Sequence, residues 1–224
     1  MYENLSFIIP FFETGTKDRA IILDWVYMRL KSLYKDSEIV LSVDNGKVFN
    51  KGKTINNGAK NATRDILVII DADIFFDKDL IDKSIENLND NDFLIPYYEC
   101  RYLEVYGTSR ILKCKHDIEL EKCPPFSANI FETSSGGISI MHKSDFDYIN
   151  GFDEDFLGWG CEDNAFMHKA SSLLNFKRLN KVIYHLYHVP CLEDDNFRNN
   201  QIRCSKINKM DKEKLIKYYD IKPH

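Results

Sequence analysis

Short apolar runs alternate with segments of helical spacing along the first hundred residues. LSFIIPFF (Leu5–Phe12), EIVLSVD (Glu38–Asp44), ILVIID (Ile66–Asp71) and DFLIPYY (Asp92–Tyr98) have the length and composition of strands. RAIILDWVYMRLKSLY, GKTINNGAKNAT and KDLIDKSIENLN lie between them and favour helices. This alternation predicts parallel β-α-β units, and therefore an α/β fold whose open, mostly parallel sheet carries helices on both faces.

The pattern changes in the second half of the chain. Periodicity is lost between Glu99 and Thr133, a stretch that contains Pro124-Pro125, so we expect a long loop or excursion beside the site. GGISIMHKSDFDYINGF then predicts a strand that leads into a short helix, and EDNAFMHKASSLL predicts a longer helix. The final MDKEKLIKYYDIKPH has the pattern of a charged amphipathic helix that packs on the outside.

Composition excludes several classes of function. The 224 residues carry a net charge of −5, so the chain has no general basic field that would hold nucleic acid. No apolar run approaches the roughly 20 residues that span a bilayer, and the N-terminus does not read as a signal peptide. The six cysteines are irregularly spaced without a CxxC pair, which favours free thiols in a reducing cytoplasm. An anionic ligand would need a metal ion or a helix N-terminus to neutralise it.

Acidic residues end two of the predicted strands. Asp44 ends the second strand, and Asp71 and Asp73 end the third in the sequence ILVIIDADIFFD. The carboxyl ends of such strands border a common ligand crevice. Because residues i and i+2 of a strand share a side, we expect Asp71 and Asp73 to face one point and to hold a hard divalent cation that bridges phosphate oxygens. The alternative is a solvated turn.

Glycine, tryptophan and acids gather between residues 136 and 166. Gly136-Gly137 would let the backbone approach a ligand or another strand closely. In GWGCED, Trp159 stands between two glycines, as expected of a mobile loop that carries a stacking surface. Glu162 and Asp163 follow, and a carboxylate there could accept a proton from an attacking hydroxyl. Their alternative role is to stabilise the start of a helix.

Two histidines occur three residues apart in YHLYHVP. His185 and His188 precede Pro190, and neutral imidazole is a common metal ligand. A histidine near a strand end can also be purely structural. The two upstream acids, which need a further metal partner, favour the metal role for at least one of them.

These segments together resemble a known family. IIPFF, FNKGKTINNGAKNA, the DxD strand end and GGISIMHKSDFDYINGFDEDFLGWGCEDN resemble GT-A fold glycosyltransferases, in particular the β-1,4-galactosyltransferase family and its bacterial relatives. The resemblance runs from Ser6 to about Pro190, apart from the stretch between Glu99 and Thr133. It implies the Rossmann-like GT-A fold.

The resemblance also implies a metal site. Asp73 would bind Mn²⁺ (or Mg²⁺) directly, with Asp71 near the nucleotide ribose or the metal. His188 corresponds to the metal-binding histidine of the family, and His185 occupies the position of a further ligand.

Catalytic and substrate-binding roles follow from the same resemblance. Asp163 matches the catalytic base, with Glu162 beside it, and Trp159 matches the tryptophan that closes over donor and acceptor. Cys161 stands where the family has a glycine, which would stiffen this loop. The resemblance also places Arg19 near the donor diphosphate, whereas Asp44 is expected to contact the base or ribose because it ends the second strand. The remaining substrate contacts are assigned to Lys53, Gly136, Gly137 and Asp71.

We therefore expect one GT-A domain over residues 1–224. Its parts would be a nucleotide-binding half (1–98), a variable insertion (99–133), an acceptor and catalytic half (134–190) and a C-terminal helical tail (191–224). It would transfer a hexose, such as galactose or N-acetylgalactosamine, from a UDP-sugar to a glycan or glycolipid-type acceptor with inversion. We expect a cytoplasmic protein that associates with the inner membrane face when its acceptor is lipid-linked. The alternatives are a nucleotidyltransferase and an inactive sugar-binding module.

Overall fold

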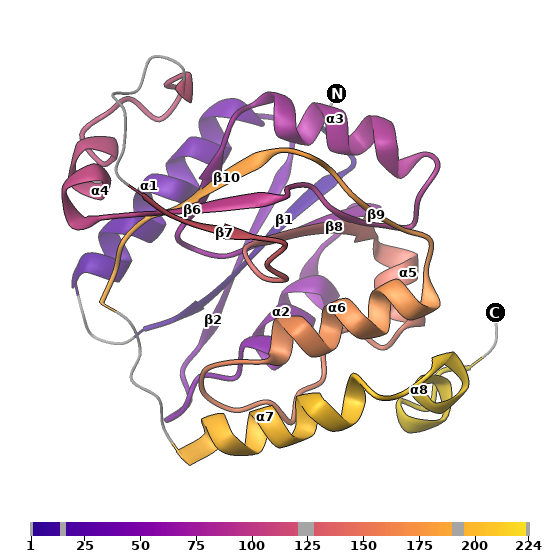
Figure 1. Cartoon of the computed structure of the whole chain (residues 1–224). Helices are drawn as coiled ribbons and strands as arrows, with labels where there is room; N and C mark the ends of the chain where they lie inside the picture. The colour runs from indigo at the N-terminus through magenta and orange to yellow at the C-terminus, as the bar shows by residue number, and fades with distance from the viewer. Residues whose placement is uncertain (1, 14–16, 121–127, 190–194, 223–224) are drawn as a thin grey trace.

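Two β-sheets organise the computed structural model, which describes residues 2–13, 17–120, 128–189 and 195–222 (Figure 1). Within these residues the main sheet has six strands, in the spatial order β2-β1-β3-β8-β5-β9. Their bounds are Leu5–Phe12 for β1, Glu38–Asp44 for β2, Ile66–Ile70 for β3, Phe93–Ile95 for β5, Ile138–His142 for β8 and Phe176–Arg178 for β9. Only β8 runs against the other five, which confirms the predicted mostly parallel sheet.

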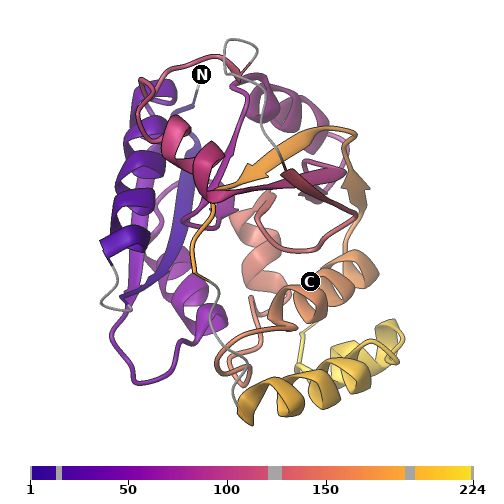
Figure 2. The same cartoon turned by 60° about the vertical axis from the view of Figure 1, so that its left-hand side comes forward.

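Helices cover both faces of this sheet. They are α1 (Lys17–Leu33), α2 (Lys51–Asn61), α3 (Asp79–Leu88), α5 (Lys143–Tyr148) and α6 (Glu162–Leu173). Neighbouring residues of a strand point to opposite faces, and on β1 these are Phe7 and Ile8. Phe7 packs on the ring of Tyr34, just after α1, at 5.1 Å between centroids. Ile8 faces Gly58 of α2, where a Cβ would overlap its side chain. α1 and α2 therefore lie on opposite faces (Figure 2).

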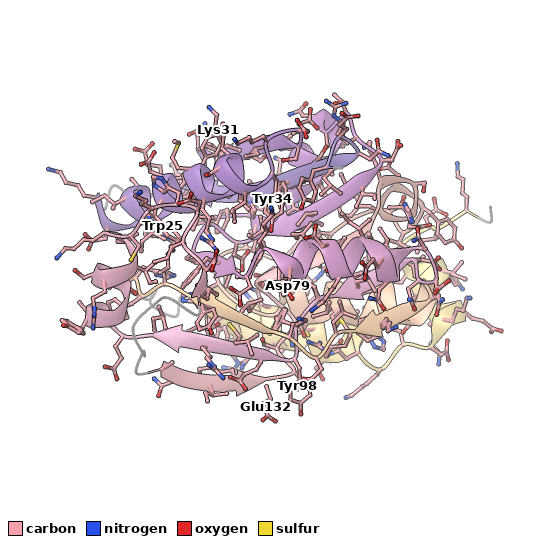
Figure 3. The ribbon with its side chains drawn as sticks, turned by 90° about the horizontal axis from the view of Figure 1, so that it is seen from above. Trp25, Lys31, Tyr34, Asp79, Tyr98 and Glu132 are labelled. Carbon is pink, nitrogen blue, oxygen red and sulfur yellow. The ribbon has the colours of Figure 1, made fainter. Side chains whose placement is uncertain are left out.

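The other helices divide between the same two faces. α3 lies on the α1 face, where the Tyr34 hydroxyl donates a hydrogen bond of 3.2 Å to the carbonyl of Lys78, just before Asp79 (Figure 3). α6 lies on the α2 face, because its Phe166 stacks at 3.8 Å on Phe152, whose backbone is bonded to a side chain of α2. This packing brings the first turn of α6 close to the first turn of α2.

A second sheet begins where β3 ends. Within the described residues its order is β4-β10-β6-β7, with bounds Ile74–Phe76, Val182–His185, Glu99–Leu103 and Ala128–Glu132 respectively. The chain passes from the main sheet into this one through the three residues 71–73. Tyr98 and Glu132, joined by a hydrogen bond of 3.1 Å, lie at its outer edge (Figure 3).

The region from 99 to 133 is more ordered than the expected long loop. It contains β6, the helix α4 (Val105–Ile111) and β7, while residues 121–127, with Pro124-Pro125, lie outside the described part. The sequence did not reveal these strands because both are short and neither is a continuous apolar run. In β7, four of the five residues are exposed, so no apolar run marks it. β7 pairs with β6, and β6 pairs with β10, so strand pairing rather than the pattern of each strand defines this sheet.

Two helices end the chain. α8 (Lys212–Tyr218) is the predicted charged helix, and α7 (Asp195–Ile207) also lies in the stretch 191–224 that was expected to be a helical tail. Both pack on α6 around a second hydrophobic cluster, formed by Phe156, Ala165, Cys204, Ile207 and Leu215. The C-terminal segment thus supports the helix that begins with Glu162 and Asp163.

The described cysteines are free thiols, as predicted, and they are Cys100, Cys114, Cys161 and Cys204. Cys123 and Cys191 lie outside the described residues. Among the helices that the structure describes, none combines the length and the apolar character needed to cross a membrane.

Candidate active site

Asp71 and Asp73 occupy the turn between the two sheets, and their carboxylates have different partners. The Asp71 backbone N–H donates to the carbonyl of Gly137 at 2.9 Å, and the N–H of Leu186 donates to the carbonyl of Asp73 at 2.8 Å. One acid is thereby tied to the double-glycine segment and the other to the end of β10. The two acids follow β3, which ends at Ile70, instead of continuing it, so strand alternation does not place their side chains. The expectation that both carboxylates face one point stays a prediction.

Asp73 faces both histidines of YHLYHVP. Antiparallel pairing places His185 opposite Ile74, the residue after Asp73. Nε2 of His188 lies 3.1 Å from Oδ2 of Asp73, and Nε2 of His185 lies 3.5 Å from Oδ1. These three residues offer one ligand atom each within 4.8 Å of one another. We call them the metal triad.

Two polar atoms of the metal triad are left unsatisfied by the described residues. Oδ1 of Asp73 and Nδ1 of His185 are buried without a hydrogen-bond partner there, which costs free energy. Burial lowers the pKa of His185, which favours the neutral form that metals bind. Burial opposes the charge of Asp73, but the histidines outweigh it and hold the pKa of Asp73 well below its usual range. One carboxylate and two imidazoles suit a divalent transition metal, so the residues fit the expected ion.

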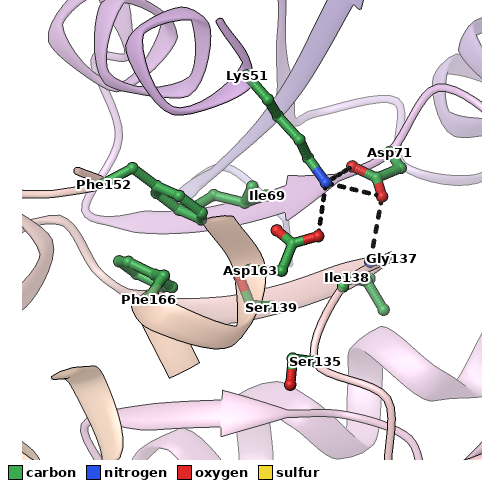
Figure 4. Close-up of a pocket in the computed structure, with 11 residues that line it drawn as sticks. Lys51, Ile69, Asp71, Ser135, Gly137, Ile138, Ser139, Phe152, Asp163 and Phe166 are labelled. Carbon is green, nitrogen blue, oxygen red and sulfur yellow. Dashed lines mark hydrogen bonds and ion pairs between the residues drawn. The ribbon is translucent and has the colours of Figure 1, made fainter. Parts of the chain in front are cut away.

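Asp71 belongs to a second group, centred on Lys51 (Figure 4). Nζ of Lys51 lies 2.8 Å from Oδ1 of Asp71 and 2.8 Å from Oδ2 of Asp163. Oε1 of Glu162 is 3.7 Å from the same nitrogen, and the Gly137 N–H donates to Asp71 at 3.2 Å. We call Lys51, Asp71, Glu162 and Asp163 the acid cluster. The prediction that Asp71 also binds the metal stays a prediction, since its carboxylate is paired with Lys51.

Three acids around one lysine give the acid cluster an excess of negative charge. Burial favours the neutral amine, but the carboxylates outweigh it and raise the pKa of Lys51 well above its ordinary value. Burial, reinforced by the neighbouring acids, raises the pKa of Asp71 to about 6 and that of Glu162 to about 7. Glu162 is therefore able to hold a proton near neutral pH.

Lys51 is the site residue that the sequence pattern did not reveal. FNKGKT offers two lysines, and Lys53 was assigned to substrate binding. The Asn50 side chain accepts a hydrogen bond of 2.9 Å from the Lys53 N–H, which makes Asn50 the N-cap and Lys51 the first residue of α2. Lys53 is exposed and does not line the pocket around Asp163, so its role stays a prediction. The sequence did contain one signal for this: an asparagine such as Asn50 is a preferred N-cap, which would have placed Lys51 in the first turn of the helix.

Gly136 and Gly137 let the backbone approach the acid cluster. A Cβ on Gly136 would overlap the carboxylate of Asp163. Gly137 has a φ of +95°, a conformation that side chains rarely adopt. The backbone therefore approaches the side chains of Asp163 and Asp71 closely. The predicted contact of Gly136 and Gly137 with a substrate stays a prediction. The Tyr97 hydroxyl, which donates to the Gly136 carbonyl, holds this segment from the other side.

Trp159 lies in a loop with three left-handed residues. Its side chain is 53% exposed, is not among those lining the Asp163 pocket, and stacks on Phe197 of α7 at 5.1 Å. Gly158 and Gly160 have φ values of +70° and +102°, and Cys161 has +75°. Glycine tolerates such angles, whereas a cysteine there costs roughly 1 kcal/mol or more.

A family profile now identifies the kind of enzyme. The profile described as "Glycosyl transferase family 2" matches residues 29–145, more than half of the chain. The protein belongs to this family of glycosyltransferases. A second profile, described as "N-terminal domain of galactosyltransferase", matches residues 110–190, which include Trp159, Asp163, His185 and His188. The resemblance to galactosyltransferases is thereby confirmed, and the chain is an enzyme.

Solved structures confirm the GT-A fold of this glycosyltransferase. The catalytic domain of Drosophila β1,4-galactosyltransferase 7, in complex with xylobiose, is 16% identical with a TM-score of 0.55, over 92% of this chain and 81% of that one. A mutant of that enzyme in complex with manganese, UDP-Gal and xylobiose is 15% identical with a TM-score of 0.52, over 92% of this chain and 79% of that one. S. aureus TarS 1–349 with UDP-GlcNAc is 12% identical with a TM-score of 0.58, over 96% of this chain and 69% of that one.

Arg19 of the glycosyltransferase lies beside the metal triad. It lines a small pocket together with Asp73, His188 and Phe11. This is where a guanidinium could pair with a phosphate group of a bound nucleotide. The predicted diphosphate contact stays a prediction that this position favours.

Asp44 of the glycosyltransferase organises the loop that follows β2. Its two carboxylate oxygens accept hydrogen bonds from the N–H groups of Gly46 and Asn50, both at 2.8 Å. This leads the chain into the cap of α2 and thus to Lys51. The predicted contact of Asp44 with the donor stays a prediction.

Proposed function

We propose that this glycosyltransferase moves a hexose from a UDP-sugar to a hydroxyl group of a glycan or glycolipid-type acceptor, with inversion at the anomeric carbon. Mn²⁺, held by the metal triad, is the proposed cofactor. The observation that supports this proposal most directly is that Asp73, beside the two histidines, and Asp71, beside Lys51, lie in one turn, two residues apart. A site for the diphosphate and a site for the proton acceptor can therefore lie on either side of the bond between the sugar and the diphosphate.

The donor side is supported by the chemistry of the metal triad. When bound, a divalent cation stabilises the negative charge that develops on the departing diphosphate. Asp73, His185 and His188 would hold it, and Arg19 would contact the diphosphate from the adjacent pocket. The solved neighbours contain UDP-Gal with manganese in one case and UDP-GlcNAc in another, which supports a UDP-sugar as donor.

The acceptor side uses the acid cluster. The Asp163 carboxylate accepts the proton of the acceptor hydroxyl as its oxygen attacks the anomeric carbon and the bond to UDP breaks. A single displacement of this kind inverts the configuration. Lys51 orients Asp163 at 2.8 Å, and Gly136 leaves the space that this carboxylate occupies. The protonatable Glu162 limits the charge in the cluster.

A panel of UDP-sugars with an oligosaccharide acceptor tests transfer. We expect Asp163→Asn to lower kcat by about 100-fold or more, because general bases contribute on that order. Asp90→Asn, an exposed carboxylate after α3, is the matched control. Full transfer by Asp163→Asn would remove this residue as the base. If the wild type transferred no sugar from any donor, the inactive sugar-binding module would be favoured. The alternative of nucleotidyl transfer is already disfavoured by the match to a glycosyltransferase family.

Metal binding is tested without activity by thermal unfolding with Mn²⁺ and with EDTA. A ligand at one hundred times its Kd adds about 2.7 kcal/mol, or about 5–10 °C in Tm. We expect Asp73→Ala and His188→Ala to lose this shift. Asp71→Asn should keep it if Asp71 serves the acid cluster alone, and its loss would restore Asp71 as a ligand.

Association with a membrane surface is part of this proposal only for lipid-linked acceptors. Co-sedimentation with liposomes that carry such an acceptor, compared with plain liposomes, measures it directly.

A further inference from the structure

The Trp159 loop, which we define as residues 157–161, packs on Phe197 and Asn200 of α7, and we call these two residues the seat of the loop. The Phe197 ring stacks on the indole of Trp159 with an angle of 25° between the planes. Phe197 also limits the loop backbone, because a Cβ on Gly160 would lie 2.9 Å from its ring. Two neighbouring positions of the loop therefore rest on one side chain of α7.

Asn200 lies one turn further along α7 and is the buried polar residue of this seat. Its side chain is 3% exposed. Nδ2 donates to the carbonyl of Leu157 at 2.8 Å and to that of Trp159 at 3.3 Å. These carbonyls flank Gly158, whose own N–H donates at 2.8 Å to the carbonyl of Phe49, just before α2. The start of the loop is thus held from two sides.

We propose that Asn200 is a positioning residue, which orders the Trp159 loop beside the active site through its two hydrogen bonds. A burial of this degree is unusual for an asparagine unless its amide is satisfied, and here the loop carbonyls satisfy both donors. Gly158 and Gly160 give the loop freedom that must be lost before Trp159 can contact a substrate. Because Asn200 already orders the loop, less conformational entropy is lost when a substrate binds, so Asn200 affects substrate binding. This inference rests on the proposed function.

The position of α7 explains how a C-terminal helix reaches the active site. Cys204 and Ile207, on the same helix, pack with Ala165 of α6 in the second hydrophobic cluster. α6 begins with Glu162 and Asp163, directly after the loop. A single helix is therefore anchored to the element that carries the proposed base and also holds the loop that precedes it.

Asn200→Ala and Asn200→Asp test the proposal, with Asn199→Ala as the matched control, since Asn199 is its exposed neighbour on α7. Asp keeps the shape of the side chain and removes both donors. The chain has two tryptophans, so the Trp159 signal is obtained as the difference from Trp159→Phe. Fluorescence anisotropy of Trp159 then reports the order of the loop, and initial rates separate KM from kcat.

We expect both Asn200 variants to lower the anisotropy of Trp159 and to raise KM for the acceptor about tenfold, as the loss of two ordinary hydrogen bonds allows. kcat should change less, and Asn199→Ala should match the wild type. If Asn200→Ala does not fold, Phe197→Leu should show the same two effects while Phe197→Tyr, which keeps the stacking, should not.

A variant with lower Tm but wild-type anisotropy and KM would overturn the proposal, because Asn200 would then be a structural residue only. Absence of transfer in the wild type would contradict the proposed function instead. In that case the anisotropy of Asn200→Ala still decides whether Asn200 orders the loop.

Discussion

Lys51 connects the two ends of the active site through one ammonium group. It pairs with Asp71 after β3 and with Asp163 at the start of α6, although these acids are 92 positions apart in the numbering of the chain. Its side chain is 12% exposed, so the pairs are poorly screened by solvent. Removing such a cation leaves acids whose charges repel one another. Losing Lys51 should therefore affect both the stability of the fold and the geometry of Asp163, the proposed base.

We expect Lys51→Met to lower the free energy of unfolding by about 3–5 kcal/mol, as when one partner of a buried pair is lost. Transfer should fall about 100-fold, since Asp163 loses its orienting partner. Urea unfolding and initial rates measure the two effects. Lys53→Met, two positions further on the exposed side of α2, is the control. The reverse pattern, with loss at Lys53 and none at Lys51, would restore the sequence-based assignment.

Helix α2 places Lys51, and its N-cap decides where the helix begins. Asn50 accepts a hydrogen bond from the Lys53 N–H at 2.9 Å and donates one to the Glu154 carbonyl at 2.7 Å. The first contact caps α2, and the second ties it to the loop before α6. The two helices that bear the acid cluster are thus connected at their N-terminal ends.

We expect Asn50→Ala to lower the free energy of unfolding by about 1 kcal/mol, the usual value of a helix cap. Transfer should fall more than stability suggests, because Lys51 lies in the turn that frays. Asn50→Asp keeps the cap acceptor and loses the donor to Glu154, so it separates the two contacts. Urea unfolding beside initial rates measures both, and normal transfer in Asn50→Ala would show that the cap does not control Lys51.

The stability of the whole molecule should depend on pH because of the acid cluster. Burial raises the pKa of Glu162 from 4.5 to about 7. A carboxyl with a raised pKa in the folded state contributes stability below its unfolded pKa, and this contribution is lost as pH rises through about 7. The folded protein therefore becomes less stable between about pH 4.5 and 7 on account of this group.

We expect Glu162→Gln to be more stable than the wild type at pH 8, by at most about 3 kcal/mol. The difference should shrink toward pH 5, where Glu162 is protonated in the folded protein. Urea unfolding at several pH values measures it, and the exposed Glu86→Gln should show no such trend. A difference that is independent of pH would mean that Glu162 keeps its charge in the folded state.

The sequence by itself determined the strands β1, β2, β3 and β5, the helices between them and the acids and histidines of the two groups of site residues, but not Lys51. An apolar run such as ILVIID must be buried on both faces, and the apolar side of an amphipathic helix must pack against other residues. These elements therefore follow from the local sequence pattern. Residue types favoured a metal role for at least one histidine, and the resemblance to the family assigned Asp73 and His188 as ligands, with His185 as a further one. Metal binding by these residues stays a prediction.

Tertiary structure decided how those residues are shared between two groups. Strand alternation predicted one target for Asp71 and Asp73, but the turn into β4 sends Asp73 to the histidines and Asp71 to Lys51. Lys51 and Asn200 were hidden because their partners lie far away in the sequence, and a polar side chain reveals no partner by its type alone. Apolar burial is encoded locally by periodicity, whereas pairing of polar groups depends on which distant segments the fold brings together.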